Sequence, residues 1–278
     1  MINNENFWVF SPQTQILNPF IKYIYILKHN SKETIGYTLP PTTSPIVGIF
    51  NGVCFDNNNT FSIESSGESF LTSRIISPRD ISSIVEFKGN IEQIGLVLTS
   101  YALKAFSFFE MPIYEIKNQL LNPLEVFGED VNFLLEELYE TTDVSKKRMI
   151  IEKYFCSKII NLNLDKRMIY ATKYIDKNAS NTNLSSLSNK LNISSKTLNR
   201  LFKEYTGITP KKYVKLTRFN NTISALKNLE IENFTKVSLQ YGYFDQSHFI
   251  KDCKEFCGDN PKNVLKNLIP YYERILWQ

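Results

Sequence analysis

Two short stretches near the C-terminal end of the 278-residue chain carry side chains of the types that read DNA bases. Arginine can pair with guanine through two parallel hydrogen bonds, asparagine and glutamine can pair with adenine, and lysine can contact guanine or phosphate. The candidate base contacts are Lys196, Asn199, Arg200, Gln246, Ser247 and Lys251. For each of them a solvated helix face or a phosphate contact is the alternative, and residue type alone does not decide.

A second set of residues is suited to phosphate oxygens, which fix a protein's position on DNA without reading its sequence. The set consists of lysines around the two stretches and of polar residues near the starts of the two helices predicted there. Its members are Ser195, Lys203, Lys211, Lys212, His248, Lys254 and Lys262.

The two stretches, 194–210 and 245–261, repeat one another at a spacing of 51 positions. Sliding one onto the other superposes Arg200 on Lys251 and Gly207 on Gly258, together with the prolines that follow. A register that stays constant over about 20 residues indicates a repeated supersecondary structure.

Each repeat has the end signals of a helix. Ser194 and Asp245 can accept hydrogen bonds from the first free N–H groups. Gly207 and Gly258 come where a left-handed residue ends a helix. Between these signals, apolar residues recur every three or four positions and predict one buried face.

A short helix is predicted before each repeat, over 184–191 with Asn183 as its cap and over 236–241 with Thr235 as its cap. A short helix, a tight turn and a second capped helix with a polar outer face form a helix-turn-helix. The sequence therefore predicts two such units, at about 184–205 and 235–256.

The segment Gly-Tyr-Phe-Asp-Gln-Ser-His-Phe-Ile-Lys-Asp-Cys-Lys-Glu-Phe-Cys-Gly-Asp-Asn-Pro, residues 242–261, resembles the signature of the AraC/XylS family of bacterial transcription regulators. Residues 194–210 are similar to the first helix-turn-helix of that family, and the likeness covers about 165–268. Cys253 stands where the family favours an aromatic residue, and Lys251 where it favours arginine, whose guanidinium fork lysine lacks. The resemblance implies double-stranded DNA as partner, and RNA polymerase if the protein is an activator.

A long helix is predicted from Pro210 to about residue 229, after a first helix over 165–178. Its 19 or so residues would span roughly 28 Å at 1.5 Å each. With the packing at its ends, such a helix can hold two recognition helices about one DNA turn apart, near 34 Å. In the family resemblance, Arg218 of this helix is expected to form a structural ion pair.

The N-terminal part reads mostly as strands, over 22–27, 46–50, 61–63, 83–87 and 92–98, with turns at 56–59, 65–67 and 88–90. The fold class is therefore α+β, with a small antiparallel sandwich or barrel before the helical part. Family resemblance implies a cupin-like sensor domain that binds a small-molecule effector. The effector is unknown from the sequence, and the aromatic residues of the strands fit a core or a pocket.

Helices follow the strands, from Tyr101 to about Phe109, over 129–140 and from about Asp143 onward. Two interpretations stay open for the last two. They pack on the barrel, or they pair two chains, because the resemblance implies a homodimer. The domain boundary is predicted at residue 160, with a sensor and dimerisation domain at 1–160 and a DNA-binding domain at 161–278.

Charge divides the chain at the same place. Residues 1–160 hold 13 Lys and Arg against 18 Asp and Glu, a balance of −5, whereas residues 161–278 hold 19 against 10, a balance of +9. The basic part carries the field expected for a phosphate partner. The acidic part would be repelled by DNA, so we expect it to face another partner.

Catalytic chemistry has little support in the sequence. There is no glycine-rich phosphate loop and no Gly-x-Ser-x-Gly motif, and His29 is the only histidine of the first half. Cys253 and Cys257 are one helical turn apart but lack the further ligands that zinc needs. We expect no enzyme activity, no cofactor and no metal. The alternatives are a barrel enzyme with an AraC-like DNA-tethering module, and a DNA-bending architectural protein.

The location expected from the sequence is the cytoplasm. Four scattered cysteines read as reduced thiols rather than as a disulfide framework. The first residues show no signal-peptide pattern, and the longest apolar run, 24–27, is far too short to span a bilayer. No membrane contact is therefore expected.

Overall fold

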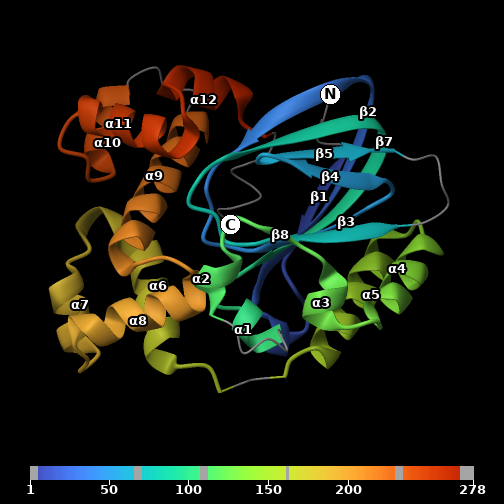
Figure 1. The fold of residues 1–278 in the computed structure, drawn as a ribbon, viewed down its shortest axis with the longest axis horizontal. Helices are drawn as coiled ribbons and strands as arrows, with labels where there is room; N and C mark the ends of the chain where they lie inside the picture. The colour runs from blue at the N-terminus through green and yellow to red at the C-terminus, as the bar shows by residue number, and fades with distance from the viewer. Residues whose placement is uncertain (1–5, 66–70, 107–111, 161–162, 229–233, 270–278) are drawn as a thin grey trace.

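The computed structural model describes residues 6–65, 71–106, 112–160, 163–228 and 234–269. An N-terminal β domain lies beside a C-terminal group of helices, and Figure 1 shows the long helix α9 (Pro210–Asn228) running along the side of that group. None of the helices within these ranges is long and apolar enough to cross a membrane.

One sheet of eight strands forms the β domain, in the order β1-β2-β7-β3-β6-β8, with β5 placed between β4 and β7. Two long antiparallel strands, β2 and β7, form its backbone and pair from Ile21–Leu98 to Leu39–Ser83. The bounds are β1 Phe7–Phe10, β2 Ile21–Leu39, β3 Ile46–Phe50, β4 Val53–Asn57, β5 Thr60–Glu64, β6 Thr72–Ile76, β7 Ser83–Leu98 and β8 Leu120–Leu121.

The predicted strands are all present, but the predicted turn at 88–90 is wrong. Those residues lie inside β7, where Gly89 adopts a φ of +90° and pairs with Ser31 of β2. Only glycine takes that backbone angle without strain. The glycine that suggested a turn therefore marks a kink within a continuous strand. The turn at 56–59 is confirmed at Asn58 and Asn59, whose φ values are positive.

Helices cover one face of the sheet. They are the 3-10 turn η1 (Gln15–Leu17), α1 (Leu103–Phe106), α2 (Ile113–Ile116), α3 (Pro123–Phe127), α4 (Val131–Tyr139) and α5 (Val144–Ser157). Phe106, Phe127 and Phe155 pack edge to face against each other and join the strand residues Ile24 and Leu96 in one core. The helices of 129–160 therefore pack on the sheet through their inner faces, and the pairing of two chains through their outer faces stays a prediction.

The C-terminal helices follow the predicted plan. They are α6 (Lys166–Asn178), η2 (Ala179–Asn181), α7 (Leu184–Lys190), α8 (Ser195–Thr206), α9, α10 (Phe234–Gln240), α11 (Gln246–Cys257) and α12 (Pro261–Asn267). The predicted end of the first helix near 109, the link 161–162, residue 229 and most of the turn 65–67 lie outside the described residues.

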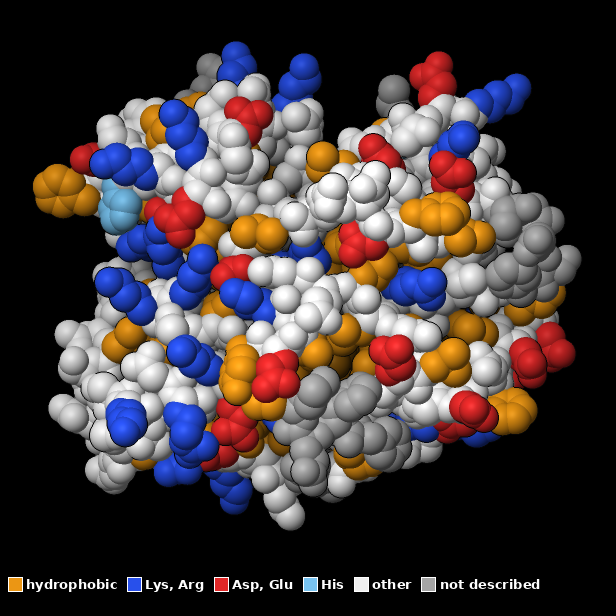
Figure 2. Space-filling model, viewed as in Figure 1, with side chains coloured by type: hydrophobic (Ala, Val, Ile, Leu, Met, Phe, Trp, Pro, Cys, Tyr) orange, Lys and Arg blue, Asp and Glu red, His pale blue; other side chains and the backbone are white. Residues whose placement is uncertain are grey.

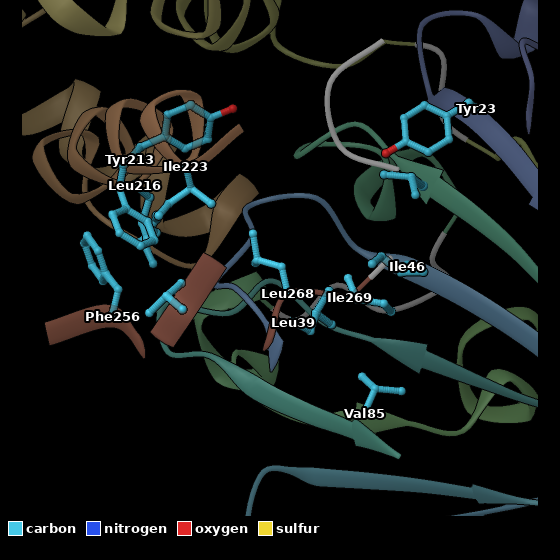
Figure 3. Close-up of a cluster of buried hydrophobic side chains, with 14 of the residues drawn as sticks. Tyr23, Leu39, Ile46, Val85, Tyr213, Leu216, Ile223, Phe256, Leu268 and Ile269 are labelled. Carbon is cyan, nitrogen blue, oxygen red and sulfur yellow. The ribbon is translucent and has the colours of Figure 1, made fainter. Parts of the chain in front are cut away.

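A second core joins the β domain to the helices. Leu268 and Ile269 follow α12 and pack between Leu39 and Val85 of the sheet on one side and α9 on the other (Figure 3). The Ile269 N–H donates to the Thr38 carbonyl oxygen at 3.0 Å, which adds this piece of chain to the end of β2. The two parts of the protein are thereby packed through shared apolar side chains.

Further contacts connect the β domain and its helices with both helix-turn-helix units. Helix α2 packs against α8 of the first unit. In the second unit the Phe256 carbonyl of α11 accepts a hydrogen bond from the Ser82 N–H at 2.9 Å. Between them, the Asn220 amide of α9 donates to the Pro41 carbonyl at 2.9 Å. The β domain therefore touches both units at once.

Candidate nucleic-acid interface

The first unit is built as its end signals predict. The Ser194 hydroxyl accepts from the Thr197 N–H at 3.1 Å, and Gly207 ends α8 with a φ of +77°. Asn192, in the turn between α7 and α8, has a positive φ of 53°. Leu198 and Phe202 are buried on the inner side of α8. These four features fix which face of α8 points to solvent.

The second unit repeats this construction. Asp245 accepts from the His248 N–H at 2.7 Å, and Gly258 ends α11 with a φ of +73°. Gly242 in the turn has a φ of +84°, and a Cβ there would lie 2.6 Å from the Ser180 carbonyl oxygen, so only glycine fits. The prediction that Thr235 caps the short helix is wrong, because α10 already includes Phe234.

A buried acid fastens α11 to α9. Asp252 is 1% exposed and lies 3.5 Å from Arg218 and 3.1 Å from Lys215, while the Tyr243 hydroxyl donates to it at 3.1 Å. The ion pair expected for Arg218 is thus confirmed. Burial opposes charge on Lys215, but hydrogen bonds to Glu255 and Asp252 outweigh it and raise its pKa. This cluster sets the angle between the long helix and the second recognition helix.

The predicted base contacts of the first unit lie together on the outer face of α8, where Lys196, Asn199 and Arg200 are exposed. The Asn199 amide donates to the Ser195 carbonyl at 2.9 Å. Arg200 lies 3.1 Å from Glu204 one turn on, with 64% of its side chain exposed. An exposed pair of this kind is worth only about 0.3–0.5 kcal/mol, so Arg200 can exchange it for another acceptor.

In the second unit, Ser247 and Lys251 are exposed on α11, and Gln246 is half-buried at its start. The Oε1 atom of Gln246 accepts a hydrogen bond from the Thr235 hydroxyl of α10 at 2.8 Å. The His248 ring packs edge-on against Tyr243, with ring centres 5.2 Å apart. His248 and Gln246 therefore each contact a neighbouring residue of the fold, whereas Ser247 and Lys251 face outward.

The predicted phosphate contacts divide into two groups. Ser195, Lys203, Lys211, Lys254 and Lys262 are exposed. Lys212 is different, because it points back to the β domain, 3.4 Å from Asp80, with only 34% of its side chain exposed. Figure 2 shows Lys and Arg side chains gathered over the C-terminal helices, which is the distribution expected of a surface that meets phosphates.

One residue of this surface was missed by the sequence reasoning. Phe244 is 86% exposed and directly precedes Asp245, the cap of α11. From the sequence, residues 242–244 are predicted only as a break between helices. The signal that could have found it is an apolar residue next to the inward-facing Tyr243, because neighbours in such a turn point in opposite directions.

A family of proteins described as a helix-turn-helix domain matches residues 187–267, which run from α7 to the end of α12. Residues 187–267 are thus similar to a helix-turn-helix domain. All six predicted base contacts lie within these residues. The match covers the C-terminal part of the chain and leaves the β domain outside.

Over 70 residues the chain is 40% identical to YidL of Escherichia coli (strain K12), described as an uncharacterized HTH-type transcriptional regulator. That match covers 25% of this chain and 23% of YidL. The whole chain is similar in fold to ToxT from Vibrio cholerae, with a TM-score of 0.50 and 14% identity over 95% of this chain and 99% of ToxT. A ToxT structure with an unsaturated fatty acid bound aligns with a TM-score of 0.48 and 15% identity, over 96% of this chain and 97% of that one. The chain thus shares with the first of these ToxT structures a fold in which an N-terminal β domain is followed by helices that include the helix-turn-helix region.

No three His, Cys, Asp or Glu side chains among the described residues come together as a metal site. All four cysteines are free. Burial raises the pKa of Cys54 to about 11 and that of Cys257 to about 12, so both stay protonated near neutral pH.

Proposed function

We propose that this protein is a sequence-specific DNA-binding transcription regulator that places α8 and α11 in successive segments of the major groove. The observation that carries the proposal is the pair of capped helices, each with base-reading side chains on its outer face, held on one helix. Helix α9 has 19 residues and spans roughly 28 Å. With the packing at its ends, this matches recognition helices about 34 Å apart. One chain would then read an asymmetric site.

In this proposal Arg200 and Gln246 make the main base contacts, with Lys196, Asn199, Ser247 and Lys251 beside them. The exposed lysines around them hold phosphates. Lys212 takes a different role, because its contact with Asp80 belongs to the junction with the β domain.

Residues 1–160 form the sensor in this proposal, and residues 161–278 form the DNA-binding domain. Support comes from the junction: the β domain contacts α8 through α2 and α11 through Ser82. A small molecule that shifts the β domain would therefore act on both recognition helices. We assign the protein to the cytoplasm, and RNA polymerase is a further partner if the protein is an activator.

The same proposal includes a homodimer formed through α4 and α5. Their inner faces are buried on the sheet, but Phe133 and Met149 on the outer faces are 68% and 65% exposed. Large apolar side chains so exposed on neighbouring helices are suited to pairing with a second copy.

The rival function, a barrel enzyme with a DNA-tethering module, would need a reactive group in the β domain. Burial raises the pKa of its two cysteines, Cys54 and Cys156, which disfavours the thiolate. His29 is 2% exposed and packs against the Phe87 ring. These surroundings favour a regulator over an enzyme.

The test is a footprint of the full-length protein on the DNA that flanks its own gene, followed by fluorescence polarisation on the protected site and on random DNA. We expect two protected major-groove segments about one helical turn apart. The protected site should bind at least about 10³-fold more tightly than random DNA at moderate salt. Equal affinity for both would refute sequence-specific regulation and would favour the architectural alternative.

A further inference from the structure

A cavity of about 610 Å³ lies between the β domain and the C-terminal helices. Its wall on the β-domain side is formed by Lys22 of β2 and by the loops 42–44 and 99–101. Its wall on the other side is formed by α6, from Thr172 to Lys177, and by Thr217 and Asn220 of α9. A volume of this size holds a small metabolite. It lies apart from the recognition faces of α8 and α11.

The charges around the cavity are mainly positive. Lys22, Lys173 and Lys177 line it, against one acid, Asp176. The described part of the chain contains no ion pair to any of these three lysines within 4.0 Å. Two of them, Lys173 and Lys177, are one turn apart on α6 and face the same space. Three ammonium groups around one cavity favour an anion.

Hydroxyl groups on the cavity wall point to a ligand as well. Ser44 and Thr217 line the cavity, and the structure gives neither side-chain hydroxyl a hydrogen bond to the described residues or a place among their buried unsatisfied oxygens. Tyr101 also lines the cavity and is 2% exposed, and its hydroxyl is buried without a hydrogen-bond partner among the described residues. A buried hydroxyl without a partner is unfavourable, and a ligand with its own polar groups would remove that penalty.

Asp176 supplies a hydrogen-bond acceptor whose orientation is fixed by a neighbouring residue. Its Oδ1 accepts from the Tyr213 hydroxyl at 2.9 Å, which holds the carboxylate at the cavity wall. A carboxylate beside three lysines would repel an anionic group but would accept a hydrogen bond from a hydroxyl. The cavity thus presents cations for one end of a ligand and hydrogen-bonding groups for the other.

We propose that this cavity binds a small organic anion that carries several hydroxyl groups. Its acidic group lies between Lys173 and Lys177, and its hydroxyls contact Ser44, Thr217 and Asp176. A sugar phosphate and a polyhydroxy carboxylic acid share this chemistry. Because both walls contribute contacts, the ligand binds only the arrangement in which the β domain and the helices are packed together.

The consequence for DNA binding rests on the proposed function. A ligand that bridges both walls stabilises the packed arrangement by its own binding free energy. The arrangement fixes α9, and α9 carries both recognition helices. Ligand should therefore change the affinity for the specific DNA site and leave the affinity for random DNA nearly unchanged.

The experiment is isothermal titration calorimetry on the full chain with four probes: glucose 6-phosphate, gluconate, inorganic phosphate and glucose. We expect binding of glucose 6-phosphate or of gluconate, and the stronger of the two identifies the acidic group. Glucose should not bind, and inorganic phosphate should bind about tenfold more weakly than the better anion. If neither hydroxylated anion binds at millimolar concentration, or if inorganic phosphate binds as well as they do, the proposal is wrong.

Variants separate the cavity from general surface charge. The double variant Lys173→Ala, Lys177→Ala should weaken binding of the anion about tenfold or more. Lys166→Ala removes an exposed lysine of the same helix outside the cavity and should change nothing. Thr217→Val keeps the shape of the side chain and should weaken binding through the lost hydroxyl. Equal losses for Lys166→Ala and the double variant would overturn the site.

The link to DNA is measured separately by polarisation on the specific site with and without the anion. Calorimetric binding without any change in DNA affinity would leave the site in place and refute the coupling. Absence of specific DNA binding in every condition would refute the proposed function, and the calorimetric result would still decide the cavity.

Discussion

The Thr235 hydroxyl of α10 donates a hydrogen bond of 2.8 Å to the Oε1 atom of Gln246, the first residue of α11. Adenine is read by an amide that accepts from N6 and donates to N7. Oε1 keeps a second lone pair, and the Nε2 hydrogens remain available. Thr235 therefore holds Gln246 in one orientation before DNA arrives, which lowers the entropy lost on binding.

The first prediction follows from that contact. Thr235→Val removes the hydroxyl but keeps the side-chain shape, and we expect it to weaken binding to the preferred site by about 0.5–1.5 kcal/mol. A double-mutant cycle with Gln246→Ala, in which DNA binding is followed by fluorescence polarisation, measures the coupling free energy between Thr235 and Gln246. If Thr235 acts through Gln246, the valine substitution should have no further effect in the Gln246→Ala background. Additive losses would mean that Thr235 contacts DNA by itself.

The helical part was predictable because its signals are local. Ser194, Asp245, Gly207 and Gly258 mark the ends of α8 and α11 by hydrogen bonds within three or four residues. Their positions, with the spacing of the apolar residues, fixed which side chains face outward. Strands β1, β4, β6 and β8 escaped prediction because short strands are defined by partners far away in sequence.

The neighbours of the candidate site could not be predicted for the same reason. Lys212 reads as a phosphate contact in the sequence, but its partner Asp80 lies in the β domain. The packing of Ile269 against the end of β2 depends on how two distant parts of the chain meet. Helix periodicity predicts on which face of its helix a residue lies, but it does not predict which other element packs against that face.

The second prediction separates base contacts from phosphate contacts on α8. Arg200→Ala should lose about 1–3 kcal/mol on the preferred site and relax the choice of base at one position. Lys203→Ala should weaken binding to DNA of every sequence by a similar factor. It should also reduce the slope of log affinity against log salt concentration by about one. Salt titrations of both variants on specific and random DNA make the comparison. If Arg200→Ala behaves like Lys203→Ala, Arg200 binds phosphate.

The third prediction concerns Phe244. Because the ring is 86% exposed, Phe244→Ser should not change the melting temperature. If the ring covers a thymine methyl group in the groove, the variant should bind the specific site about 1 kcal/mol more weakly. Replacing thymines of the site by uracil should then weaken the wild type but not the variant. Leu239→Ser, an exposed apolar residue of the same unit, is the control and should bind normally.

The fourth prediction concerns Asp80, which lies 2.7 Å from Lys117 and 3.4 Å from Lys212 of α9. Burial alone would raise its pKa, but hydrogen bonds from Lys117 and Asn118, with the charges of Lys117 and Lys212, hold the pKa below the ordinary 3.8. A lowered folded pKa contributes stability that is present above the unfolded pKa and is lost as pH falls through the folded one. Asp80→Asn should therefore destabilise by about 1–3 kcal/mol at neutral pH.

That loss should shrink as the pH falls through the lowered pKa of Asp80 in the folded protein, where the wild-type carboxylate also becomes protonated. Urea unfolding at several pH values measures both the loss of stability at neutral pH and its decrease in acid. Glu64→Gln, which removes an exposed pair with Lys88 at 3.7 Å, should cost about 0.5 kcal/mol or less at neutral pH. A difference between Asp80→Asn and wild type that stays constant across the acid range would show that the charge of Asp80 plays no part.

The last prediction tests the proposed homodimer. Phe133 on α4 and Met149 on α5 are exposed while the opposite faces of both helices are buried on the sheet. If these side chains pair two copies, the solution mass should be about twice the 32.3 kDa of the chain.

The double variant Phe133→Glu, Met149→Glu should then be a folded monomer, because charges buried without a partner are strongly unfavourable in an interface. Ile84→Glu, at an apolar site on β7 that is 47% exposed, should stay dimeric. Light scattering gives the masses and circular dichroism the fold. A wild type that is monomeric at micromolar concentration would remove α4 and α5 as an interface, and the asymmetric site would then be read by one chain alone.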